Sequence, residues 1–142
     1  MPEKPIMPEP RIILVDDEPE ADAIIRHQLA EAGFTGRIET LGTVRTATDF
    51  LLRELSHGGQ TPTCVLLDLS LPDGHGFEIL KLLRSDPRGA GWFVAVVTNF
   101  TDPADRDGAF SLGADRFLEK YPSTEEMRVL IEDARAPRSR PI

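Results

Sequence analysis

Short apolar runs alternate along this chain with segments whose apolar residues recur at helical spacing. A parallel strand that is buried on both faces has a nearly continuous apolar sequence, and runs such as 12–15, 64–67 and 94–97 have this character. Strands that alternate with helices are typical of βαβ units. The alternation therefore predicts an α/β fold: a doubly wound, five-stranded parallel sheet with helices on both faces.

The boundaries of these elements follow from turn and capping residues. We expect strands at residues 11–15, 37–44, 64–69, 92–97 and 116–119. Helices are expected at about 19–32, 46–56, 77–84, 103–112 and 124–134, and residues 72–76 are expected to form a loop. Asp17 with Glu20, and Ser123 with Glu126, have the spacing of a capping box at the start of the first and last helices.

Four of the predicted strands end in residues suited to phosphoryl chemistry. These residues are Asp16 with Asp17, Asp68, Thr98 and Lys120. Right-handed crossovers place the carboxyl ends of parallel strands along one edge of the sheet, where ligand sites of open α/β sheets lie. Each residue taken singly has a structural explanation, such as a helix cap, a strand end or a surface lysine. Their occurrence at four strand ends favours one shared site.

The chemistry of these side chains indicates a phosphoacceptor site. Asp68 ends the most apolar run, and a carboxylate in that position can act as a nucleophile that forms an aspartyl phosphate. Asp16 and Asp17 would repel Asp68 unless a cation were present, and Mg²⁺ prefers such oxygen ligands. Thr98 and Lys120 are expected to bind the phosphoryl oxygens.

Size and charge restrict the class of protein. The 142 residues suffice for one domain, which we place at residues 11–134, between a disordered Pro-rich lead-in at 1–10 and a flexible Arg/Pro tail at 135–142. The net charge of −8 argues against a nucleic-acid partner. The single cysteine, Cys64, favours a reducing compartment and a core position. Since no membrane span or secretion signal is recognisable, we expect a cytoplasmic protein without a membrane partner.

Four motifs give the chain its resemblance to a known family. They are Leu14-Val15-Asp16-Asp17-Glu18, Leu66-Leu67-Asp68-Leu69-Ser70-Leu71-Pro72-Asp73-Gly74, Val96-Val97-Thr98, and Gly113-Ala114-Asp115-Arg116-Phe117-Leu118-Glu119-Lys120. In this order they resemble the receiver domain of response regulators in two-component signalling. The resemblance covers about residues 11–134, and it implies the flavodoxin-like strand order 2-1-3-4-5.

The resemblance also implies a role for each matching residue. Asp68 resembles the phosphoacceptor, and Asp16 and Asp17 resemble the acidic pair that binds Mg²⁺ together with Asp68. Ser70 matches the position whose backbone carbonyl also binds the metal. Thr98 matches the switch hydroxyl and Lys120 the lysine that pairs with the phosphoryl group. Phe117 matches an aromatic switch, for which a plain core or edge role is an equal alternative.

Two positions depart from the family pattern. Tyr121 stands where the family usually has a proline that forms a cis peptide with the lysine, so a cis bond is considered instead between Tyr121 and Pro122. Asn99 follows the switch hydroxyl where a small residue is usual, and we expect it to alter the rate of autodephosphorylation.

The sequence thus predicts a stand-alone response regulator rather than a turnover enzyme. It would accept a phosphoryl group from a histidine kinase or histidine phosphotransfer protein onto Asp68. It would signal to a downstream effector protein as a monomer, or as a weak dimer through the last helix–strand–helix face. One alternative is a receiver-like interaction module that works without phosphorylation. A less favoured one is a small phosphatase with Asp68 as nucleophile, although such enzymes have a second acid where this chain has Ser70.

Overall fold

A computed structural model describes residues 10–57, 61–99 and 101–136. Five parallel strands form one sheet in the order β2-β1-β3-β6-β7, which confirms the predicted fold class and order 2-1-3-4-5. Their bounds are β1 Arg11–Val15, β2 Arg37–Leu41, β3 Cys64–Leu67, β6 Val94–Thr98 and β7 Arg116–Glu119.

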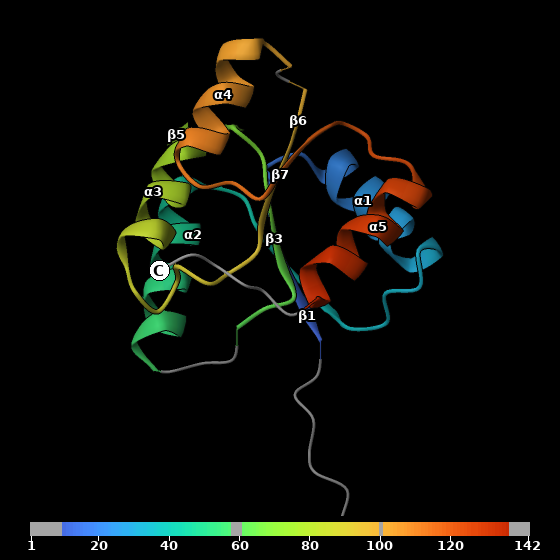
Figure 1. The fold of residues 1–142 in the computed structure, drawn as a ribbon, viewed down its shortest axis with the longest axis horizontal. Helices are drawn as coiled ribbons and strands as arrows, with labels where there is room; N and C mark the ends of the chain where they lie inside the picture. The colour runs from blue at the N-terminus through green and yellow to red at the C-terminus, as the bar shows by residue number, and fades with distance from the viewer. Residues whose placement is uncertain (1–9, 58–60, 100, 137–142) are drawn as a thin grey trace, which may run out of the picture.

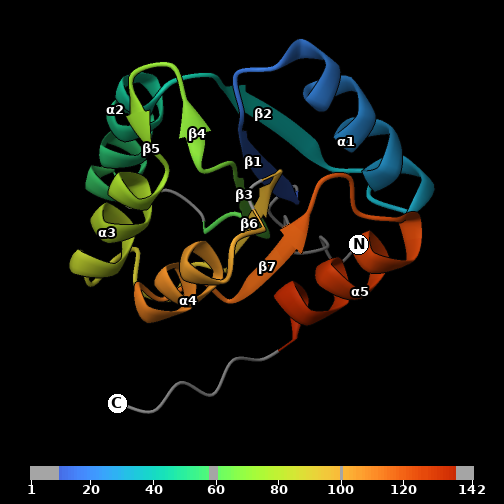
Figure 2. The same ribbon diagram turned by 90° about the horizontal axis from the view of Figure 1, so that it is seen from above.

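Helices cover both faces of the sheet. Helices α1 (Pro19–Glu31) and α5 (Thr124–Arg135) lie on one face, and α2 (Val44–Ser56), α3 (Phe77–Ser85) and α4 (Pro103–Ser111) lie on the other (Figure 1). The view along the sheet in Figure 2 shows the resulting three layers.

The three central strands are apolar because both of their faces are covered. Every residue of β3 and β6 is buried, and so are four of the five residues of β1. Successive side chains of a strand point to opposite faces. In β3, Cys64 and Leu66 therefore pack with α1 and α5, whereas Val65 and Leu67 pack with α2 and α3. The two hydrophobic clusters hold the central strand ends in place.

Several element boundaries differ from those predicted. The strand expected at 37–44 ends at Leu41, because Thr43 caps α2, which already begins at Val44. The strand expected at 92–97 covers Val94–Thr98, since Trp92 N–H donates to the Gly89 carbonyl in a turn. The strand expected at 64–69 ends at Leu67.

Most of the segment 72–76, predicted to be a plain loop, belongs to a short antiparallel hairpin at residues 70–75. Its strands are β4 (Ser70–Leu71) and β5 (Gly74–His75), in which Ser70 pairs with His75 and Leu71 with Gly74. A two-stranded hairpin of this length gives little periodic signal in a sequence.

One of the two predicted capping boxes is present. Ser123 accepts from Glu126 N–H and the Glu126 side chain accepts from Ser123 N–H, which confirms the box at α5. The box predicted for Asp17 and Glu20 is wrong, because the N-cap of α1 is Glu18 and makes no side-chain cap bond.

The turn after β7 differs from the expectation as well. The cis peptide bond of the described residues joins Lys120 to Tyr121, not Tyr121 to Pro122.

The predictions for the ends of the chain lie largely outside the described residues, which exclude 1–9 and 137–142. Helix α5 extends through Arg135, one residue beyond the predicted domain end. No helix of the described residues combines the length and the apolar character that crossing a membrane requires.

Candidate functional site

The sheet brings the predicted site residues to one edge. Asp16 and Asp17 follow β1, Asp68 follows β3, Thr98 is the last residue of β6 and Lys120 follows β7. The strand pairing continues past the strand ends, since Asp68 N–H donates to the Val15 carbonyl and Lys120 N–H to the Thr98 carbonyl, each over 2.9 Å. The positions of Asp68 and Lys120 are therefore fixed by the backbone as well as by their side chains.

Lys120 connects the carboxylates of two different strands. Its Nζ lies 2.6 Å from Asp16 Oδ2 and 3.0 Å from Asp68 Oδ2, and the exposed fractions of the three side chains are 0%, 1% and 5%. Nζ donates a hydrogen bond to Asp68. Its contact with Asp16 is a close ion pair without hydrogen-bond geometry, so Asp16 Oδ2 is a buried oxygen that lacks a hydrogen-bond partner within the described part of the chain.

Burial and charge act in opposition on these groups. Burial raises the pKa of Asp16, although the Lys120 ammonium and the Glu18 N–H act the other way. Burial alone would lower the pKa of Lys120, but the neighbouring carboxylates of Asp16 and Asp68 outweigh it and raise that pKa. Lys120 consequently remains a cation throughout the neutral pH range.

The carboxylate of Asp68 is nearly buried. The residue is 4% exposed, its Oδ1 accepts from Leu69 N–H over 2.8 Å and its Oδ2 accepts from Lys120 Nζ. These two donors fix the orientation of the carboxylate plane.

The acidic residues form a group that could hold a metal ion. One carboxylate oxygen each from Asp16, Asp17, Glu18 and Asp68 lies within 4.8 Å of the others. The four carboxylates outnumber the Lys120 ammonium beside them, so a cation would relieve their repulsion. An all-oxygen donor set suits hard cations such as Mg²⁺ rather than zinc or copper.

Glu18 is a member of this group that the sequence analysis did not select. Its Oε1 lies 3.7 Å from Lys120 Nζ, and its side chain is 48% exposed. The available signal was its position as the third acid in the run after β1. That run also contains the predicted metal pair, but sequence alone does not show which of three acids face the crevice.

Two further predicted residues lie at or near this edge. Thr98 is fully buried at the end of β6, and Ser70 is exposed in β4, two residues after Asp68. The roles assigned to their hydroxyl and carbonyl groups stay predictions.

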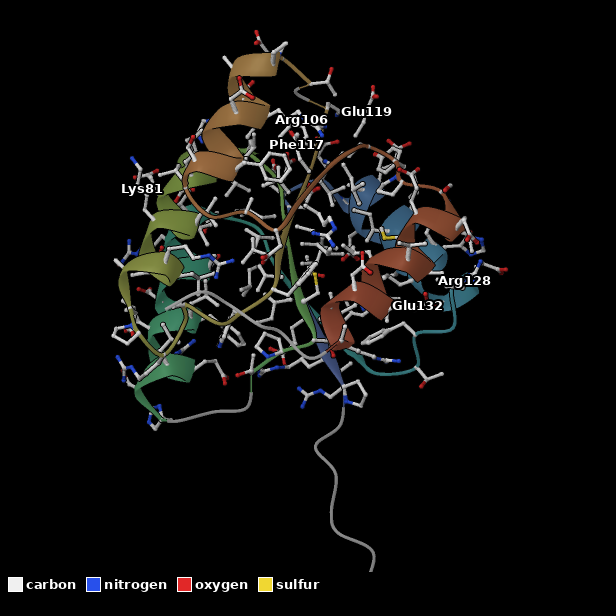
Figure 3. All side chains as sticks on the ribbon, in the orientation of Figure 1. Lys81, Arg106, Phe117, Glu119, Arg128 and Glu132 are labelled. Carbon is white, nitrogen blue, oxygen red and sulfur yellow. The ribbon has the colours of Figure 1, made fainter. Side chains whose placement is uncertain are left out.

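Phe117 lies in β7 and is partly buried. The guanidinium of Arg106, on α4, lies 5.9 Å from the centre of the Phe117 ring and 5.4 Å from that of Phe110. Figure 3 shows Arg106 beside Phe117, where α4 meets β7. The predicted aromatic switch thus contacts a cation of the neighbouring helix.

Known proteins are similar to this chain in sequence and in fold. The chain is 34% identical over 122 residues to the probable methanogenesis regulatory protein FilR2 of Methanothrix harundinacea, a match that covers 86% of this chain and 79% of that protein. It is 31% identical to the transcriptional regulator RpaA of Synechocystis, covering 83% of this chain but only 46% of RpaA.

A solved structure, the Mn²⁺-bound form of response regulator Rcp1, superposes with a TM-score of 0.71 at 22% identity, over 89% of this chain and 91% of that one. This likeness concerns the fold. The family described as response regulator receiver domain matches residues 12–132, which is most of the chain. The chain belongs to the response-regulator receiver domain family.

Proposed function

We propose that this protein is a phosphorylation-dependent switch that accepts a phosphoryl group on Asp68 from a histidine kinase or a histidine phosphotransfer protein. The observation that carries the proposal is the placement of Lys120 Nζ against both Asp16 and Asp68, with the two other carboxylates of the cluster, Asp17 and Glu18, alongside. Such an arrangement joins a nucleophile, a fixed positive charge and a cation-binding set in one crevice.

Mg²⁺ is the proposed cofactor. Asp16, Asp17 and Asp68 would hold it through their carboxylates and Ser70 through its backbone carbonyl, with Glu18 as an additional acid of the same cluster. When bound, the ion supplies charge that offsets the repulsion between Asp68 and the incoming phosphoryl oxygens. That solved relatives include an Mn²⁺-bound response regulator supports a divalent site of this kind.

The protein side chains would act as follows. A carboxylate oxygen of Asp68 attacks phosphorus, the bond between phosphorus and the imidazole nitrogen of the donor breaks, and that nitrogen retains the electron pair. Lys120 exchanges part of its contact with Asp68 for the phosphoryl oxygens, and Thr98 donates its hydroxyl to them. Hydrolysis by water would later restore the Asp68 carboxylate.

The signal would leave through the surface of α4, β7 and α5. Movement of Thr98 toward the phosphoryl group would be coupled to the position of Phe117, which lies against α4 through Arg106. A downstream effector protein would recognise this surface. We propose that the protein acts as a stand-alone receiver in the cytoplasm, as a monomer or as a weak dimer through the same surface.

Intact-protein mass spectrometry after treatment with acetyl phosphate tests the proposal. With Mg²⁺ the protein should gain one phosphoryl mass, and Asp68→Asn or chelation of the metal should abolish the gain. No gain in the wild-type protein would favour a phosphorylation-independent interaction module. Multiple turnovers on phosphomonoesters would favour the phosphatase alternative.

A further inference from the structure

A hairpin beside the phosphorylation site carries one of the proposed metal ligands. Strands β4 and β5 follow directly after Asp68, and Ser70 lies in β4. The hairpin is short, and an isolated two-stranded hairpin has little stability of its own. Its geometry must therefore depend on contacts with the rest of the protein.

The base of the hairpin is closed against Asp68. Gly76 N–H donates to the Leu69 carbonyl over 2.8 Å, and a Cβ at Gly76 would lie 2.3 Å from the Asp68 carbonyl oxygen. His75 N–H donates to Glu78 Oε2 on α3 over 3.1 Å. Because the base packs so closely on Asp68, a displacement of the hairpin would be transmitted to the backbone of the site.

The tip of the hairpin is attached to a different helix. Asp73 Oδ1 accepts from Val44 N–H over 2.7 Å and Asp73 Oδ2 accepts from Arg45 N–H over 3.0 Å. These are the first two residues of α2, whose N-terminal end attracts a carboxylate. Figure 2 shows the hairpin beside α2 and α3.

Helix α2 does not need Asp73 for its own cap. Thr43 is the N-cap and forms a complete capping box: its hydroxyl accepts from Thr46 N–H over 3.0 Å, and Thr43 N–H donates to the Thr46 hydroxyl over 3.2 Å. Asp73 binds two other N–H groups of the same helix end. The contacts of Asp73 therefore couple the hairpin to α2, and they do so in addition to capping two N–H groups of that helix.

We propose that Asp73 is a positioning residue of the phosphorylation site, which fixes the Ser70 backbone beside Asp68 by attaching the β4–β5 hairpin to the N-terminus of α2. This role rests on the proposed function only in taking Ser70 as a metal-binding position. It predicts that Asp73 influences cation binding from outside the acidic cluster.

The test compares Asp73→Ala with Thr43→Ala in the full chain. Both variants remove acceptors from the first turn of α2, but only Asp73→Ala detaches the hairpin. Titration calorimetry with Mg²⁺ should show an affinity about tenfold lower for Asp73→Ala, as for other groups that orient metal ligands, and a wild-type affinity for Thr43→Ala. Asp73→Asn retains one acceptor oxygen and should recover part of the affinity.

Amide hydrogen exchange provides a second readout that involves neither metal nor phosphorylation. The amides of residues 70–75 other than Pro72 should exchange faster in Asp73→Ala than in the wild type. In Thr43→Ala these amides should exchange at the wild-type rate. Wild-type Mg²⁺ affinity in Asp73→Ala would overturn the proposal, as would an equal loss in both variants. A wild-type protein that binds Mg²⁺ but gains no phosphoryl group would instead contradict the proposed function and leave this comparison valid.

Discussion

Lys120 offsets part of the negative charge of the site. Its ammonium is fully buried between the carboxylates of Asp16 and Asp68. Removing one partner from a buried ion pair leaves the other uncompensated, at a cost of about 3–5 kcal/mol. We therefore expect Lys120→Met to lower the free energy of unfolding by about this amount in metal-free buffer, as measured by urea denaturation.

Mg²⁺ should offset part of this loss, because a bound cation replaces the missing positive charge. Lys81→Met, which removes an exposed lysine from α3 (Figure 3), is the matched control and should be nearly neutral. A loss of stability for Lys120→Met that is the same with and without Mg²⁺ would contradict the view that lysine and metal serve the same carboxylates.

Individual site residues differ in how far the sequence could predict them. Asp16, Asp68 and Thr98 each follow or end a buried strand and Lys120 follows the edge strand β7, so the shared edge of a parallel sheet predicts their neighbourhood. The contact between Asp73 and α2 could not be predicted, because it joins two turns separated by 28 or 29 residues. Such contacts depend on how loops fold, which hydrophobic periodicity does not encode.

Among the structural elements, the hairpin and α2 are coupled by a charge that pH can remove. The N–H groups of Arg45 and Val44 lower the pKa of the Asp73 carboxyl. A depressed folded-state pKa gives stability that is present above the unfolded value of about 3.9 and is lost as pH falls through the folded value.

Thermal denaturation of the wild type and Asp73→Ala from neutral to acid pH checks the direction of this pH dependence. The wild type should melt at the higher temperature at neutral pH, and the difference should shrink as the pH falls below about 3.9 and disappear once the Asp73 carboxyl is protonated in the folded protein. A difference in melting temperature that persists unchanged into acid would show that the carboxylate charge is not responsible.

Helix α4 is held to the protein by few buried groups. Ala109 is its one buried residue, and Arg106 stacks on the rings of Phe110 and Phe117. A cation–π contact at an exposed site contributes about 0.5–1 kcal/mol. Arg106→Met should therefore broaden or split the ¹⁹F signal of a fluorinated Phe117, because the ring loses a partner that favours one rotamer.

Arg128→Met is the control for this experiment. Arg128 lies on α5 and pairs with Glu125 and Glu132 rather than with a ring (Figure 3). Identical Phe117 spectra in the wild type and Arg106→Met would exclude a role of this contact in the aromatic switch.

The sequence predicted which segments are helices and which are strands better than it predicted where each element begins and ends. Helix α2 begins two residues before its predicted start because Thr43 forms the cap, and the hairpin at 70–75 has no periodic signal. Apolar periodicity locates the middle of an element, whereas its ends depend on individual side-chain hydrogen bonds.

The whole molecule depends on two hydrophobic clusters separated by the sheet. Leu66 and Leu67 are neighbours in β3, both fully buried, and they belong to opposite clusters. Leu66→Ala and Leu67→Ala should each lower the free energy of unfolding by about 2–5 kcal/mol in chemical denaturation. A large loss in only one of them would contradict a sheet that is covered equally on both faces.

As a receiver domain, the protein is a signalling module of two-component systems with an acidic, metal-compatible pocket. Receiver domains work with histidine kinases. The strand order was predicted through the family resemblance that the four sequence motifs carry. The motifs did not predict the cis peptide bond between Lys120 and Tyr121. The family has a cis bond where a proline follows the lysine, and in this chain Tyr121 stands at that position.

The most direct test of the account is to locate the phosphoryl group. Protein treated with acetyl phosphate and Mg²⁺ is reduced with borohydride, which converts an aspartyl phosphate to homoserine, and the product is mapped by tandem mass spectrometry. The account predicts homoserine at residue 68 and its absence when Mg²⁺ is chelated. Modification at Asp16 or Asp17 instead, or an unmodified Asp68 under conditions that saturate the metal site, would contradict it.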